Sequence, residues 1–489
     1  MKHLKQFSTT AERTTYMDAT PIPAYPYVHY IAKDKSVIYS GQEVDVPFYF
    51  ENISGLSVKF SNSYEYSRDG ITWLAATSST LVSFSPEERV YFRASGLTAS
   101  SSSGIGKFTV QTGTCNIGGN LMSMLYGADY RGKTEIEQTH AFYKMFEAQK
   151  GIISARFLAL PATALTNYCY YQMFYNCTDL IFAPDSIPAT TLASYSCGSM
   201  FYGCTSLRKT PMMHVTSMGS YSCYYMFYKC SSLVSAPMNL GLTLAESCCY
   251  NMFYQCSSLV SAPELPATEL AKSCYHTMFY GCTALVNAPE LPATKLAESC
   301  YYSMFSGCTS LVNAPELPAL TLPGASTVST LGHIGCYYSM FSGCTALVNA
   351  PKLPATTLGL GCYNSMFYGC TALVNAPELP ATTLAGACYA GMFKGCTSLV
   401  NAPELPATTL VYSSSGTKYY GCYGSMFYGC SSLNHIKAMF TTTPGANYTA
   451  DWVNGVAAEG TFIKNSKAAW TTTGVAGVPS GWTVETADA

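Results

Sequence analysis

The chain has 489 residues, with 26 basic and 28 acidic side chains, and only 11% of its residues are charged. A balance this close to neutral excludes the broad basic surface that binds nucleic acid or anionic membranes. No stretch of 18 apolar residues occurs, so we expect no membrane insertion. Motifs of serine hydrolases, phosphate-binding loops and zinc proteases are also missing from the sequence, and we expect no catalytic residue, no metal site and no cofactor.

The N-terminal part divides into a polar arm and a strand-rich module. Residues 1–40 contain too little apolar sequence for a core, so we expect an arm that orders on a partner; an unattached tail is the alternative. Residues 41–112 alternate short apolar runs with turns, and the stretch around Arg68, Asp69 and Gly70 predicts a hairpin. We therefore expect a small all-β, sandwich-like module there, followed by a linker and an N-terminal cap repeat over 113–163.

The pattern Met-Phe-x-x-Cys then recurs ten times, with methionine at 173, 200, 226, 252, 278, 304, 340, 366, 392 and 426. Six of the nine intervals are 26 residues. A fixed period of this size predicts a solenoid over 164–440, in which stacked coils share one core. Residues 441–489 contain three of the four tryptophans and predict a C-terminal cap.

One clear repeat shows how a coil is expected to fold. Its predicted core consists of Met278, Phe279, Cys282, Leu285, Leu291 and Cys300. The segment from Leu285 to Leu291 is short and ends at a proline, which predicts one brief strand per coil, paired in parallel with its equivalents. Cys300 and Met304 lie four residues apart, which favours a short helical or 3₁₀ turn on the opposite side. These features predict an α/β repeat solenoid.

The 22 cysteines fall mostly into one pair per repeat, such as Cys274 with Cys282, while Cys115 and Cys249 are left over. Disulfides, zinc sites and ladders of buried free thiols are the three alternatives. Free cysteine packs as a small apolar residue, and the seven histidines do not recur in phase with the cysteines. We therefore expect reduced thiol ladders.

The signature Met-Phe-x-Gly-Cys-x-x-Leu, as in Met304 to Leu311, followed by Leu317 and Pro318, resembles the 26-residue leucine-rich repeat of BspA-type surface proteins. The resemblance covers about residues 145–450, and the Leu-Pro-Ala-Thr variant is similar to proteins of gut anaerobes and their bacteriophages. It implies a binding or surface-display role and transfers no catalytic residue.

The start of the chain bears on where such a protein would act. Residues 1–15 lack the apolar segment of a secretory leader, so we expect a virion protein made in the host cytoplasm. Its expected partners are a host-surface glycan or protein and, through the arm, other virion proteins; it could also form an oligomer. A BspA-type bacterial cell-surface adhesin and a glycan-degrading enzyme are the alternatives.

Two repeats carry insertions at the same phase, after the Leu-Pro segment and before the next Cys-Tyr. Insertions at one phase of a solenoid emerge on one side, often the binding side, although drift in tolerant loops is the alternative. The candidate binding residues in these loops are Pro323, Ser326, Thr327, His333, Tyr412, Ser414, Tyr419 and Tyr420.

Two other features repeat once per coil. Glutamate recurs at 264, 290, 316, 378 and 404, interrupted by Lys352, and we interpret this stripe as a solvated face rather than a ligand site. The stripe of Asn287, Asn313, Asn375 and Asn401 is the alternative binding face. The 39 tyrosines suit a recognition surface, although many could complete the packing of the coils.

Overall fold

The computed structural model describes residues 43–94, 96–324, 335–415 and 418–488, and the side chains of 415–420 are not described. The predicted arm over 1–40 lies outside these residues. Residues 42–489 form one compact unit. Its strands are β1 (Tyr49–Phe60), β2 (Tyr64–Ser67), β3 (Leu74–Ala76), β4 (Val82–Ser83), β5 (Arg89–Arg93), β6 (Phe108–Asn120), β7 (Ile152–Ala159), β8 (Ala164–Leu165), β9 (Thr191–Leu192), β10 (Met213–Met218), β11 (Met238–Leu244), β12 (Tyr412–Ser415), β13 (Lys418–Gly421), β14 (His435–Ala438), β15 (Thr461–Asn465) and β16 (Thr483–Ala487).

The described residues begin with a sheet domain. Strands β1 to β7 form one seven-stranded sheet in the order β3-β2-β5-β1-β6-β7, with β4 paired to β1. The predicted hairpin is present as antiparallel β2 and β3, with Tyr64 opposite Ala76. Strand β6 pairs in parallel with β7. The ring of Phe108 in the sheet domain stacks on that of Phe146, which belongs to the cysteine-free first repeat, with centroids 6.0 Å apart. The sheet domain and the solenoid therefore share one core.

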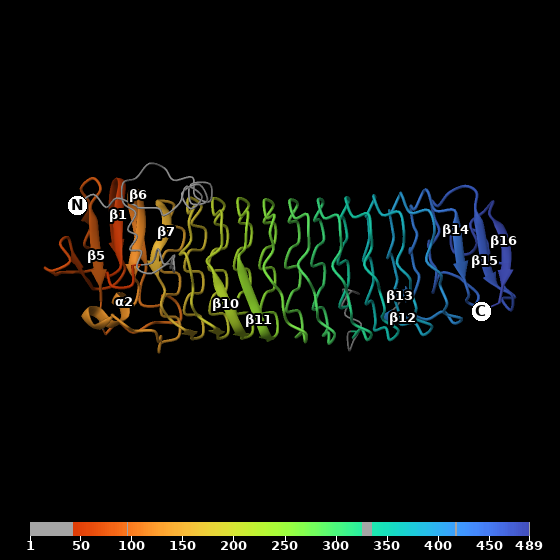
Figure 1. The fold of residues 1–489 in the computed structure, drawn as a ribbon, viewed down its shortest axis with the longest axis horizontal. Helices are drawn as coiled ribbons and strands as arrows, with labels where there is room; N and C mark the ends of the chain where they lie inside the picture. The colour runs from red at the N-terminus through yellow and green to blue at the C-terminus, as the bar shows by residue number, and fades with distance from the viewer. Residues whose placement is uncertain (1–42, 95, 325–334, 416–417, 489) are drawn as a thin grey trace, which may run out of the picture. The chain divides into compact units, whose positions relative to one another are not determined.

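The repeats form a β-solenoid of about 12 turns with almost no helix, so the predicted α/β class is wrong. Within the described residues, the helical elements are only α2 (Ser123–Tyr126) and the 3₁₀ turn η1 (Gly127–Asp129), both before the repeats. Figure 1 shows the coils lying side by side between the sheet domain and strands β14 to β16.

The Met-Phe-x-x-Cys segment of each repeat, with the residues just before it, is a ribbon of consecutive turns, called the turn segment below. Ser299, Ser303 and Gly307 have φ values of 55°, 48° and 75°, which a right-handed helix cannot contain. Between these positions, alternate N–H groups bond three residues back, as from Met304 to the carbonyl of Tyr301 at 3.2 Å. The other N–H groups bond to the next coil, as from Phe305 to the carbonyl of Met340 at 2.9 Å. The expected helical turn is therefore replaced by a ribbon that shares its bonds between coils.

The predicted strand after the cysteine is reduced to one bridged residue in most coils. Parallel bridges join Asn287 to Asn313 and continue through Asn349 and Asn375 to Asn401. Proline at two positions after each asparagine, such as Pro289 and Pro292, removes the N–H groups that a longer ladder would need. Fuller parallel strands occur at β10, β11 and β14 to β16, where the second proline of this pattern is missing.

Stacked side chains fill the interior. The six residues expected to form the repeat core are buried, with exposed fractions of 3% for Leu291 and 0% for the other five. The phenylalanines of successive turn segments stack nearly parallel, with centroids 5.5 Å apart for Phe279 and Phe305. All 22 cysteines are free and buried. The Sγ of Cys308 donates to the carbonyl of Phe279 in the preceding coil at 3.1 Å.

Three indoles lie at the C-terminal end of the solenoid. Trp452, Trp470 and Trp482 are buried, and each ring N–H donates to a backbone carbonyl at 2.8–3.1 Å. Trp452 also takes the next place after Phe427 in the ring column, with centroids 6.1 Å apart. These indoles cover the last coil and satisfy their own donors in doing so.

Candidate functional site

The second insertion forms a hairpin packed between neighbouring coils (Figure 1). Strands β12 and β13 pair antiparallel, with Tyr412 opposite Gly421. A side chain on Gly386 of the preceding coil would collide with Ser413, so the glycine lets the hairpin stem approach that closely. On the other side, the ring of Tyr412 meets Tyr448 edge to face at 5.5 Å.

The structure describes the side chains of two candidate residues of this hairpin and only the backbone of the other two. Tyr412 is 42% exposed, and Ser414 is exposed on the same strand. Tyr419 and Tyr420 lie on β13, opposite Ser414 and Ser413. The hairpin backbone thus brings four consecutive pairs of residues together at the edge of the solenoid.

The first insertion is described only at its base. Pro323 is half-buried, and a side chain on Gly324 would collide with the backbone of Gly359 and Leu360 in the next coil. Ser326, Thr327 and His333 lie outside the described residues. The stem of this insertion therefore packs on its neighbouring coil, as the hairpin does.

Exposed side chains at equivalent positions of successive coils form columns on the face of the solenoid that follows the turn segment in sequence. Seven valines, one per coil, have exposed fractions of 36–51%: Val234, Val260, Val286, Val312, Val348, Val374 and Val400. The asparagines that follow the last five of these valines are also exposed. An apolar stripe of this kind is a common mark of an interaction surface.

Two carboxylates of the glutamate stripe have partners within the protein. Asn239 donates to Glu264 at 3.1 Å, and Lys437 pairs with Glu404 at 3.0 Å. Among the described residues, no lysine or arginine lies within ion-pair distance of Glu290 or Glu316. All five glutamates of the stripe are exposed, so the middle of the stripe differs from its ends in the partners of its carboxylates and not in its exposure.

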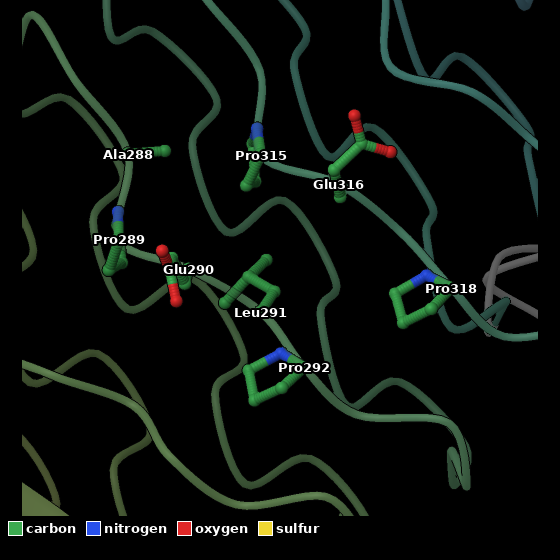
Figure 2. A pocket seen from close by; sticks show the side chains of 8 residues that line it. All are labelled: Ala288, Pro289, Glu290, Leu291, Pro292, Pro315, Glu316 and Pro318. Atoms are coloured by element: carbon green, nitrogen blue, oxygen red, sulfur yellow. The ribbon is translucent and has the colours of Figure 1, made fainter.

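The middle of the stripe borders a shallow hollow of about 350 Å³ (Figure 2). Pro289 and Pro292 of one coil and Pro315 and Pro318 of the next line it, with Ala288 and the largely buried Leu291 below. Glu290 and Glu316 contribute the two carboxylates. The hollow is thus an apolar surface bordered by negative charge.

Sequence reasoning missed this hollow, although one signal was available. Leu320 is 61% exposed, whereas the equivalent positions in five other coils are threonines: Thr268, Thr294, Thr356, Thr382 and Thr408. The same position nearer the N-terminus holds a second exposed leucine, Leu242, which is 66% exposed. An exposed apolar residue with threonine at the same position in both adjacent coils, Thr294 and Thr356, indicates a surface that differs from its immediate surroundings.

A metal centre and a membrane-spanning helix are two further features that a sequence of this kind could contain. No cluster of three or more histidine, cysteine, aspartate or glutamate side chains there could hold a metal ion. None of the helices in the described ranges has the length and apolar character needed to cross a membrane.

Two comparisons with known proteins gave no match to the chain. No protein-family model matches it, and no curated protein matches its sequence. The resemblance to BspA-type repeats therefore stays a prediction from the repeat signature.

Proposed function

We propose that this chain is a non-enzymatic recognition protein that displays a repetitive solenoid surface, and that it serves as an adhesion component of a bacteriophage particle. The observation that carries the proposal is the bracing of the β12–β13 hairpin between Gly386 and Tyr448. An insertion retained only by drift needs no fitted support from two neighbouring coils. Exposed tyrosine on a rigid stem is suited to recognising glycans or protein loops.

The state of the cysteines supports the particle assignment over a bacterial surface adhesin. Free thiols at every cysteine suit a protein that folds in a reducing cytoplasm, as a virion component does. An exported adhesin would fold in an oxidising compartment. The arm over 1–40 is proposed to join other virion proteins, and disulfide-linked repeats in the native protein would favour the adhesin instead.

Excision of the insertions tests the recognition role. Removing eight residues from the hairpin and ten from the first insertion restores the 26-residue period, so stability should change by less than about 1 kcal/mol. Binding of the fluorescently labelled protein to cells of gut anaerobes, measured by flow cytometry, should fall at least tenfold.

A variant with a Gly-Ser hairpin of unchanged length is the matched control. It should lose binding as well, because it keeps the fold and removes the tyrosines. Undiminished binding by the excised protein would place the receptor face elsewhere, on the wall that carries the valine and asparagine columns.

A further inference from the structure

We propose that the hollow between Glu290 and Glu316 is a docking site for an extended protein segment that carries one basic and one apolar side chain four residues apart. The proposal rests on the recognition role above and names the chemistry of one ligand. Its elements are the two carboxylates, the proline-lined surface between them and the exposed Leu320.

The carboxylates favour a cation. Glu290 and Glu316 occupy equivalent positions in adjacent coils, which lie roughly 4.8 Å apart. Like charges at that spacing repel, and a cation between them relieves both. In the next coil the protein supplies such a cation itself, because Lys352 stands where the others have glutamate. A basic side chain from a partner would do the same one coil earlier.

The surface between the carboxylates favours a chain with apolar parts. The proline rings form an apolar surface on which the methylene groups of a lysine or arginine side chain can pack. The charged end of that side chain then remains at the carboxylates. Leu320 extends this apolar surface along the same coil, and its neighbours in the column are threonines. Leucine has more apolar surface than threonine, so burying Leu320 against an apolar partner side chain contributes more to binding than burying a threonine would.

The spacing of the outward residues favours an extended partner. Glu316, Pro318 and Leu320 face outward, while Leu317 and Ala319 are buried, so this segment alternates like a strand. Outward residues then repeat about every 6.8 Å, the same step as alternate residues of an extended peptide. A basic residue at one position and an apolar residue four positions away would meet Glu316 and Leu320 together.

A peptide titration with the full chain tests the proposal. The probe is Leu-Thr-Ala-Thr-Lys-Thr-Ala-Thr-Leu, labelled and blocked at both ends, which presents the pattern in either chain direction. Fluorescence anisotropy should show saturable binding that weakens as salt is added. Acetylation of the probe lysine should weaken binding at least tenfold.

Three variants separate the site from general electrostatics. The double change Glu290→Gln and Glu316→Gln should weaken binding at least tenfold, and Leu320→Thr at least threefold. Glu378→Gln, in the same stripe but away from the hollow, should leave binding unchanged. All four positions are exposed, and thermal melting should show that each variant remains folded.

The proposal is overturned by the absence of saturable binding, by equal losses in Glu378→Gln, or by unchanged binding in the other variants. Binding of maltohexaose that depends on the same residues would also overturn it, because the site would then take a neutral glycan. Loss of cell binding on excision of the hairpin is independent of these outcomes, so the two proposals can fail separately.

Discussion

The second cysteine of each repeat combines two properties that no other small residue offers together. Burial raises the pKa of the Cys308 thiol, so it stays protonated and can donate. The carbonyl of Phe279 accepts that S–H and also the N–H of Cys282 at 3.1 Å, which satisfies both of its lone pairs. Alanine would lack the donor, and serine would bring a more strongly hydrated hydroxyl into the core. The thiol is both core atom and link between coils.

His276 lies in a column of stacked rings, and its presence there predicts that the stability of the protein falls in acid. Its ring lies 4.4 Å from both Tyr250 and Tyr302, and burial lowers its pKa from 6.5 to about 4. The folded state thus favours the neutral ring. Stability is complete above pH 6.5 and declines by up to about 3 kcal/mol as the pH falls to 4.

Replacement of this histidine by tyrosine continues the column and removes the titration. Urea unfolding at pH 7 and pH 4.5 should show a smaller loss for His276→Tyr than for the wild type. Tyr302→Phe, which alters the adjacent ring without removing the histidine, should keep the full loss. Equal losses in all three proteins would contradict the assignment.

The turn ribbon depends on left-handed residues at every fourth position. Where this position is glycine, as at Gly307, no strain arises; where it is serine, as at Ser303, the backbone is held by bonds to the next coil. The N–H of Ser303, for example, donates to the carbonyl of Tyr338 at 2.7 Å. The ribbon therefore gains its conformation from stacking as much as from its local sequence.

Gly307→Ala tests the backbone requirement without a packing change. An added Cβ would lie 3.6 Å from the Cα of Gly281, an ordinary contact, so the cost should come from the φ of 75° alone. We expect a loss of about 1 kcal/mol in unfolding free energy. Gly445→Ala, at a position with open space and no left-handed φ, should cost almost nothing. Similar effects at the two glycines would disprove the explanation.

At the scale of the whole molecule, each coil is bonded mainly to its two neighbours. Backbone N–H groups of the Met-Phe-x-x-Cys segment donate to the next coil, whereas cysteine thiols and other backbone N–H groups, such as that of Val312, donate to the preceding one. Stability is then a sum over neighbouring pairs, and coils near an end have less support once a cap opens. The sheet domain and the three indoles cover those ends.

Thiol labelling should report this order of opening. In native protein we expect almost no alkylation, since all 22 cysteines are buried, and in denaturant without reductant we expect 22 adducts by mass spectrometry. Under mild denaturant, Cys430 near the C-terminal cap should label before Cys308 in the middle. Simultaneous labelling would indicate a single cooperative unit, and fewer than 22 adducts would indicate disulfides.

The sequence by itself determined the repeat, its phase and its buried residues, because a period near 26 with apolar positions in phase can be satisfied only by stacking. It also located both insertions, since they lengthen the period at one point. Tertiary structure decided the rest. Cys300 and Met304 have helical spacing, but bonds to the next coil compete for the N–H groups a helix would use, so turns form instead. The hollow is made by prolines 26 residues apart that become neighbours only when the coils stack.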